Sequence, residues 1–346
     1  MRGPSEADAA PLLAGLPERI EAAAERIRPF LSPTPFERAT APPGPGGDAS
    51  GVVRWKLECF QITGSFKIRG ALNRLLVLRE TEGRRALTDG VVTASSGNHG
   101  RAVAHALDLL GGRGLVFLPG TVADAKRRAL EERYGGVVEL RLVGEDTIEA
   151  ENAAREEAER SGRPLIPPYN DVEVIAGQGT AGFEMDRQLG PDPLDAVLVP
   201  VGGGGLIAGV AGWLRHARPG IRVVGCQPRA SYVIAASVRA GRLLESGAEV
   251  PFEPTLADGV AGGVEEGSVT LGLCRDLVDE WVLLDEGEIA AAMRFVLRER
   301  FAVVEGSAAL SVAAFPQLDP RPVSAGLVLS GAAVSSEGLS VLAGTN

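Results

Sequence analysis

Short β-branched runs that end in glycine- or serine-rich turns, each followed by a stretch rich in alanine, leucine and arginine, recur along this chain. Repeated alternation of strand and helix is typical of a parallel sheet, because parallel neighbours need a crossover connection. The runs are apolar throughout, which is expected where helices cover both faces of the sheet. The pattern therefore predicts an α/β fold.

The individual elements follow from the same pattern. The expected strands are residues 90–94, 114–118, 137–142, 196–200, 222–226 and 325–329. The expected helices are residues 68–80, 100–110, 123–134, 147–161, 179–189, 206–215 and 286–300. Residues 41–50 are rich in proline and glycine and predict a flexible segment.

Length, charge and cysteine content narrow the class of protein. With 346 residues, 45% of them hydrophobic, the chain has room for two domains. A net charge of -10 argues against a nucleic-acid partner, because nucleic-acid binders show a basic face. The 3 cysteines are far apart, which predicts neither disulfides nor a metal cluster and suits a reducing cytoplasm. We expect neither a secretion signal nor a membrane span.

The sharpest local signal is a run of four glycines between an expected strand and an expected helix: Gly202, Gly203, Gly204 and Gly205. Such a run is costly in conformational entropy unless the backbone must approach something closely. A phosphate at the helix N-terminus is the natural occupant, and a merely tight turn is the alternative. The spacing matches neither a dinucleotide fingerprint nor a Walker loop, which favours a single phosphate ester.

Three further segments carry polar groups at the ends of expected elements. Lys67 follows a Gly-Ser turn and precedes a helix, where it would ordinarily be a helix-end cation. Ser330 ends an apolar strand and is followed by glycine, as in a simple turn. The third segment aims backbone N–H groups and side-chain donors at whatever lies beyond a strand end, which favours an anion, although a capped turn is the alternative. It consists of Ser95, Ser96, Gly97, Asn98 and His99.

Together these segments resemble the fold-type II family of pyridoxal-phosphate enzymes, and within it the branch of threonine/serine dehydratases and serine racemases. The resemblance runs from about Trp55 to Gly331. His99 after Asn98, and Ile68-Arg69 after the lysine, distinguish this branch from that of cysteine synthase. The matching motifs stand in the family's order: Ser65-Phe-Lys67-Ile-Arg-Gly-Ala, Ser95-Ser-Gly-Asn-His, Ala176-Gly-Gln-Gly-Thr180, Gly202–Gly205 and Leu329-Ser-Gly.

Within the branch the chain is most similar to hydroxyectoine-utilisation dehydratases, which are threonine-dehydratase-like. That likeness rests on four segments: Ile166-Pro-Pro-Tyr-Asn, Val174-Ile-Ala-Gly-Gln-Gly-Thr, Thr255-Leu-Ala-Asp and Val303-Val-Glu-Gly-Ser-Ala. The resemblance implies the tryptophan synthase β-like architecture, with two open twisted sheets flanked by helices. It also implies a small domain, residues 89–166, inserted into a large cofactor-binding domain made of residues 1–88 and 167–346. We expect a homodimer.

Roles for single residues come from the same resemblance. Lys67 is expected to carry pyridoxal 5'-phosphate as a Schiff base and to act as general base at the substrate Cα. The other expected cofactor contacts are Phe66, Asn98, the four glycines 202–205 and Ser330. Residues 95–99 are expected to hold the substrate carboxylate. Ser96 stands where serine racemases have an opposite-face acid/base, and its alternative role is that of a second cap.

The activity implied is β-elimination of water and ammonia from a β-hydroxy amino acid to give a 2-keto acid, an ammonia-lyase of class EC 4.3.1.-. Racemisation, β-replacement, a hydroxyectoine-derived substrate and cofactor binding without turnover stay open as alternatives. Glu305 either faces the pocket or interacts with a helix dipole. Gln227 replaces the glutamate that holds a divalent cation in racemase-like members, so no metal is expected. Ala332-Ala333 stand where Gly/Ala-Asn is common and are expected to change the pyridine environment.

Overall fold

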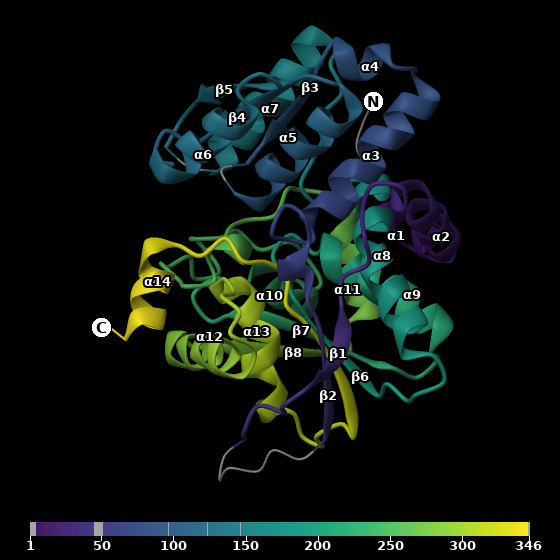
Figure 1. Ribbon diagram of the computed structural model, residues 1–346, viewed down its shortest axis with the longest axis vertical. Helices are drawn as coiled ribbons and strands as arrows, with labels where there is room; N and C mark the ends of the chain where they lie inside the picture. The colour runs from purple at the N-terminus through teal and green to yellow at the C-terminus, as the bar shows by residue number, and fades with distance from the viewer. Residues whose placement is uncertain (1–4, 45–50, 96, 123, 146, 345–346) are drawn as a thin grey trace.

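The computed structural model describes residues 5–44, 51–95, 97–122, 124–145 and 147–344. Within these residues the strands form two separate sheets, one of six strands and one of three. Figure 1 shows the smaller sheet and its helices in the upper half of the molecule and the larger sheet below, with α3 running between them. The expected architecture of two open sheets flanked by helices is confirmed.

In spatial order the larger sheet consists of β1 (Phe36–Ala39), β2 (Val52–Lys56), β9 (Ser324–Val328), β6 (Ala196–Pro200), β7 (Arg222–Pro228) and β8 (Glu280–Leu284). The smaller sheet consists of β3 (Val91–Ala94), β4 (Gly114–Leu118) and β5 (Val138–Leu142). Neighbouring strands are parallel except for the antiparallel pair β1 and β2. All the strands expected from sequence are present, whereas β1, β2 and β8 were missed.

Helices cover both faces of each sheet. Those around the larger sheet are α1 (Ala9–Ala14), α2 (Leu16–Ile27), α8 (Val172–Leu189), α9 (Gly205–Ala217), α10 (Val233–Ala240), α11 (Val269–Leu277), α12 (Glu286–Arg300), α13 (Gly306–Ala314) and α14 (Ser336–Ala343). The upper half contains α3 (Lys67–Thr81), α4 (Arg85–Thr88), α5 (Asn98–Leu110), α6 (Asp124–Tyr134) and α7 (Thr147–Ser161). Among the described residues no helix combines the length and the apolar character needed to cross a bilayer.

The central strand β6 shows why the strands are apolar throughout. Val197 and Val199 point into the core formed with α2, α8 and α9, whereas Ala196 and Leu198 point into the core formed with α12 and α13. Both faces are dry, so no position of β6 favours a polar side chain. The three cysteines are free and buried in these cores.

Helix α8 begins seven residues before the expected start at residue 179. Asp171 caps it by accepting hydrogen bonds from the amides of Glu173 and Val174. Its glycines serve close packing, since a Cβ on Gly177 would come within 2.6 Å of the Gly70 Cα on α3. Residues 45–50 of the expected flexible segment lie outside the described residues.

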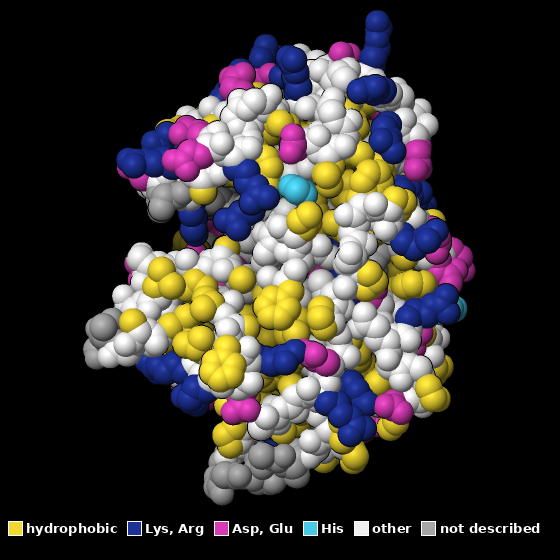
Figure 2. All heavy atoms as spheres, in the orientation of Figure 1, with side chains coloured by type: hydrophobic (Ala, Val, Ile, Leu, Met, Phe, Trp, Pro, Cys, Tyr) yellow, Lys and Arg dark blue, Asp and Glu magenta, His cyan; other side chains and the backbone are white. Residues whose placement is uncertain are grey.

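The parallel topology places several loops at one edge. The segments after β2, β9 and β6 leave the larger sheet at its carboxyl edge, and the segment after β3 leaves the smaller sheet in the same way. Ligands of open α/β sheets bind in crevices outside such edges. The fold therefore brings together the four segments that the sequence singled out, and Figure 2 shows the outline notched between the two halves.

Candidate active site

Lys67 is the first residue of α3, and its Nζ donates a hydrogen bond to the carbonyl oxygen of Pro168 at 2.9 Å. The chain has three lysines. In the described residues Lys56 pairs with Glu184, and Lys126 pairs with Asp258. The Lys67 amine has no ion-pair partner there, which leaves it available for chemistry.

Burial lowers the pKa of Lys67 to about 8, against the opposing effects of Glu151 and Glu305. A desolvated ammonium group is disfavoured, so the neutral amine exists at a lower pH than in water. A neutral lysine amine can act as a nucleophile or a base. The turn before it is anchored, because the Phe66 amide donates to the carbonyl oxygen of Ser330 at 3.1 Å.

A buried charge network holds the first turn of α3. The Arg69 guanidinium donates to both carboxylate oxygens of Glu58, at 2.7 and 2.8 Å, and to Glu184 at 2.7 Å. Burial alone would lower the pKa of Arg69, but these two carboxylates raise it above its ordinary value. Because an unpaired buried charge is costly, the network fixes α3 against α8 and against the short segment that follows β2.

Asn98 and Glu305 meet across the site. The Asn98 Nδ2 lies 3.0 Å from both carboxylate oxygens of Glu305, and the Ala333 amide donates to Glu305 Oε2 at 3.0 Å. Glu305 is 4% exposed, and burial raises its pKa to about 7 while the Asn98 hydrogen bonds oppose the rise. Its side chain makes no capping hydrogen bond to α13 within the described residues, which favours the pocket alternative over the helix-dipole one.

The glycine loop packs too tightly for side chains. A Cβ on Gly203 would lie 2.4 Å from the ring of Tyr169, and one on Gly205 would lie 3.1 Å from the Tyr169 backbone. Gly204 has a φ of 84°, a conformation that residues other than glycine rarely adopt. No side chain of the described residues caps α9, so the N–H groups of its first turn are free for an anion.

The loop after β3 lies at the start of α5. The Gly97 amide donates to the Ser95 hydroxyl at 3.2 Å, and Ser96 lies outside the described residues. His99 is buried, with its Nε2 at 3.0 Å from the carbonyl oxygen of Ile166. Burial and the charge of Lys67 lower the pKa of His99 to about 3, so the ring is neutral.

Because the His99 Nε2 faces a carbonyl oxygen, it carries the proton, and Nδ1 is left as an acceptor. A neutral His99 ring therefore cannot donate to a substrate carboxylate through Nδ1, and a contact from this residue would use its backbone N–H. His105 packs against Tyr134, and exposed His216 lies against Trp213.

Sequence reasoning missed several residues around the lysine. Pro168 and Tyr169 belong to a segment noticed only as a sign of ancestry, and Glu151 and Glu265 belong to no motif. Gln227 stands where the family resemblance implies a carboxylate ligand of a divalent cation. The Gln227 side-chain Nε2 donates to the Val201 carbonyl at 3.0 Å, and its Oε1 accepts from the Ala235 amide at 2.9 Å. Both polar atoms of the side chain are therefore used in hydrogen bonds to the backbone.

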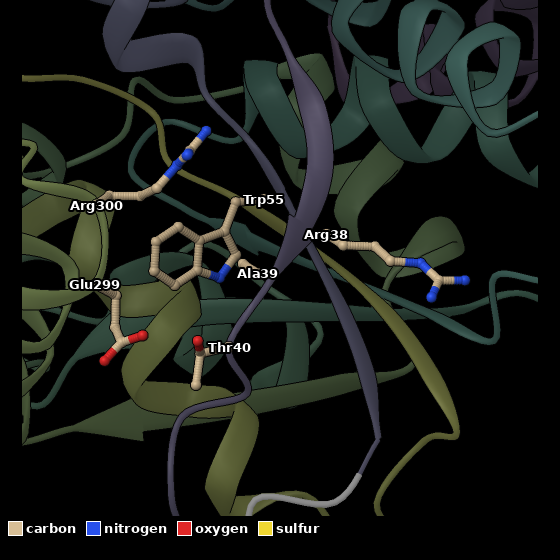
Figure 3. A pocket seen from close by; sticks show the side chains of 6 residues that line it. All are labelled: Arg38, Ala39, Thr40, Trp55, Glu299 and Arg300. Carbon is tan, nitrogen blue, oxygen red and sulfur yellow. The ribbon is translucent and has the colours of Figure 1, made fainter.

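A cavity of about 390 Å³ lies apart from the residues around Lys67, between β1 and the end of α12. Figure 3 shows the Trp55 indole in its wall, with the Arg38 side chain directed away from Arg300. Arg300 pairs with Glu37, and Glu299 adds a further carboxylate. Glu37, which does not line the cavity, neutralises Arg300, and Arg38 and Glu299 carry opposite charges, so the charge of this cavity favours no ion.

Residues 27–331 match the family model described as "Pyridoxal-phosphate dependent enzyme". The chain belongs to this family. It is 41% identical over 262 residues to an L-threonine ammonia-lyase of Geobacter sulfurreducens, in an alignment that covers 76% of this chain and 62% of the relative. The chain thus spans under two thirds of that relative's length.

Two solved structures show the same fold as this pyridoxal-phosphate-dependent enzyme. The processed form of threonine deaminase isoform 2 from Solanum lycopersicum superposes with a TM-score of 0.82 at 31% identity, covering 98% of this chain and 94% of the other. Maize serine racemase superposes with a TM-score of 0.80 at 30% identity, covering 93% and 95%. These likenesses confirm the family, the fold and the cofactor expected from sequence.

The residues present fit pyridoxal phosphate. Lys67 offers the amine that its aldehyde needs, and the glycine loop offers a cradle that a Cβ would obstruct. Among the described side chains, Asn98 Oδ1 and Ser65 Oγ are buried polar atoms without a partner. Buried polar groups normally find a partner, so these atoms are consistent with a ligand in the site.

Proposed function

We propose that this chain is an ammonia-lyase that removes water and ammonia from a β-hydroxy amino acid, such as serine or threonine, to give a 2-keto acid. The observation that carries the proposal is the half-buried Lys67 amine, which has no ion-pair partner in the described residues and a lowered pKa. The neighbouring Phe66 amide contacts the Ser330 carbonyl, and Pro168, which accepts from the amine, precedes the Tyr169 that packs on the glycine loop. The likeness to a threonine ammonia-lyase and a threonine deaminase supports this class of reaction.

In this proposal Lys67 binds the cofactor, and its amine takes the Cα proton of the substrate. A pKa near the working pH suits a lysine to that task. The bound cofactor supplies the electron sink for the negative charge that develops at Cα. Ser330 would hold the pyridine nitrogen, where its hydroxyl would stabilise negative charge less than a carboxylate would. Departure of the β-hydroxyl would be favoured as a result.

The glycines 202–205 would hold the cofactor phosphate, Phe66 would line the cofactor site, and Asn98 would contact the phenolic oxygen. Glu305 acts as a positioning residue for Asn98, because its carboxyl group holds the Asn98 amide and is itself held by the Ala333 amide. The N–H groups of the 95–99 loop would bind the substrate carboxylate at the start of α5. For Ser96 we propose the role of opposite-face acid/base, on the basis of its position in the family motif alone.

The test is a panel of hydroxy amino acids given to the purified holoenzyme, with 2-keto acid and ammonia measured together. We expect serine or threonine to give both products in equal amounts. Formation of the opposite enantiomer without keto acid would favour a racemase, a class supported by the likeness to maize serine racemase. A thioether formed from added thiol would favour β-replacement. Turnover of a hydroxyectoine-derived amino acid alone would favour that substrate, and cofactor binding without any product would overturn the proposal.

We also propose that residues 89–166 form the smaller domain, inserted between residues 1–88 and 167–346. The two ends of this segment lie side by side, since the Val92 amide donates to the Pro164 carbonyl and the Ile166 amide donates to the Val92 carbonyl. Thr93 adds a side-chain hydrogen bond to the Ile166 carbonyl at 2.8 Å.

We also propose that the protein is located in the cytoplasm.

A homodimer is proposed from an exposed apolar surface formed by Phe60, Ile62, Phe301 and Val303. Phe301 is 91% exposed, and Phe60 and Ile62 are each 54% exposed. Both segments lie beside the chain that follows β9, since the Cys59 amide donates to the Leu329 carbonyl and the Glu305 amide donates to the Gly331 carbonyl. Apolar side chains gather over the lower half of the face in Figure 2, and adjacent exposed apolar groups mark contact surfaces.

Replacing Phe301 by serine is expected to shift this dimer towards monomers, because it removes the most exposed apolar side chain of the surface. Size-exclusion chromatography with light scattering, repeated across a dilution series, measures the change in molecular mass. Val323→Ser, at a 74% exposed residue before β9, is the matched control and should leave the mass unchanged. A wild-type monomer at all concentrations would contradict the proposal.

Metal dependence is expected to be absent, because the Gln227 amide is neutral and is committed to Val201 and Ala235. An amide oxygen binds a hard cation less strongly than a carboxylate does. Keto acid formation should therefore be the same in EDTA and in Mg²⁺. Activity that is lost in EDTA and recovered with Mg²⁺ or Ca²⁺ would contradict this prediction. A metal response gained in Gln227→Glu would indicate a degenerated cation site.

A further inference from the structure

A cavity of about 460 Å³ lies between the two halves of the molecule. One wall comes from α7, through residues that include Glu151 and Arg155. The other comes from residues 263–266, which precede α11 and include Glu265 and Glu266. The cavity therefore spans the cleft between the smaller and the larger sheet.

This cavity adjoins the reaction centre. Lys67 Nζ donates to the carbonyl oxygen of Pro168 at 2.9 Å, and Tyr169 is the next residue in the chain. The charges of Glu151 and Lys67 also affect each other's pKa. The Tyr169 hydroxyl accepts a hydrogen bond from the Glu265 amide at 3.0 Å, and the Tyr169 ring lies against Gly203 of the glycine loop. One residue thus contacts both the cavity wall and the proposed phosphate cradle. A substrate held at Lys67 has this space beside it for its side chain.

The walls carry an excess of negative charge. Glu265 is paired with Arg155 at 2.5 Å, and Glu266 is exposed. For Glu151 no hydrogen bond or ion pair occurs within the described part of the chain, so its charge is not neutralised by a direct partner. Burial, followed by the charge of Glu265, raises the pKa of Glu151 to about 7. The carboxylate is therefore mostly ionised at pH 8.

We propose that Glu151 selects substrates by side-chain charge, admitting neutral or cationic side chains and repelling those that carry a carboxylate. This inference rests on the proposed elimination activity and narrows its substrate class. Serine and threonine would enter the site, whereas 3-hydroxyaspartate would be disfavoured. Like charges in a partly desolvated cleft repel each other, and such repulsion is an efficient source of specificity.

The test compares Glu151→Gln with the wild-type holoenzyme at pH 8 and low ionic strength. We expect kcat/KM for L-threo-3-hydroxyaspartate, relative to that for L-serine, to rise roughly tenfold in the variant, as one repulsive charge is removed. The difference should shrink in high salt, because ions screen partly exposed charges. Glu156→Gln is the matched control, since Glu156 is an exposed residue of α7 that does not line the cavity.

A second measurement separates this inference from the proposed function. L-alanine and L-aspartate differ by one side-chain carboxylate, and neither carries a β-hydroxyl, so their binding can be followed without elimination by the visible absorbance of the holoenzyme. Weaker wild-type binding of L-aspartate than of L-alanine, relieved in Glu151→Gln, supports the role of Glu151 even if no keto acid forms. An unchanged ratio of the two dissociation constants, or an equal change in Glu156→Gln, overturns it. Absence of keto acid from every hydroxy amino acid overturns the proposed function instead.

Discussion

Replacing Lys67 by alanine is expected to abolish elimination, with a loss of at least about 10³-fold in the rate of keto acid formation. The variant lacks both the amine that binds the cofactor and the base that takes the Cα proton. The visible absorbance of the holoenzyme should disappear as well, while far-ultraviolet circular dichroism stays that of the wild type. The fold is expected to survive because the Lys67 side chain carries no ion pair of the described structure.

Lys126→Ala is the matched control, since Lys126, unlike Lys67, has an ion-pair partner in the described structure, Asp258. That variant should keep its visible absorbance. A Lys67→Ala protein that retained both absorbance and keto acid formation would mean that another lysine carries the cofactor. Lys56 is a poor candidate because it is buried between Glu184 and the Thr34 carbonyl.

Replacing Gly203 by alanine is expected to weaken cofactor binding by roughly tenfold or more, because the backbone could no longer approach the phosphate closely. The new Cβ would lie 2.4 Å from the Tyr169 ring, so either the loop or the ring must shift. Titration of apoenzyme with pyridoxal phosphate, followed by absorbance, measures the dissociation constant directly. Saturating cofactor should restore much of the lost activity, which distinguishes weaker binding from a damaged reaction centre.

The control for this substitution is Gly136→Ala. A Cβ on Gly136 would meet no heavy atom within 4 Å, and the residue has no positive φ. It lies just before β5, away from the glycine loop. Equal loss of cofactor affinity in both variants would point to general destabilisation, and unchanged affinity in Gly203→Ala would remove the glycine loop from the proposed phosphate site.

Elements with a strong local pattern could be predicted closely. The bounds of α7 and α12 agree with the expected ranges, because each follows a polar N-terminal signal and has a clear helical composition. The strands β1, β2 and β8 were missed because they are short and carry charged residues, as in Val-Val-Arg-Trp-Lys of β2. The Arg54 charge is satisfied by Asp192, a partner 138 residues away that no local pattern reveals.

For the site, the sequence by itself predicted an anion at the glycine loop and at the Asn98 loop, because each combines an unusual local composition with a strand end. The roles of Lys67 and Ser330 came only from the resemblance of their motifs to the family. Only the tertiary structure decided which lysine has no ion-pair partner among the described residues, and that the Glu305 carboxyl group holds Asn98. It also decided that Glu151 of α7 lines one cavity together with residues 263–266, and that Tyr169 restricts the glycine loop. The physical reason is that burial, pKa and charge compensation depend on partners from distant parts of the chain, which local residue patterns do not encode.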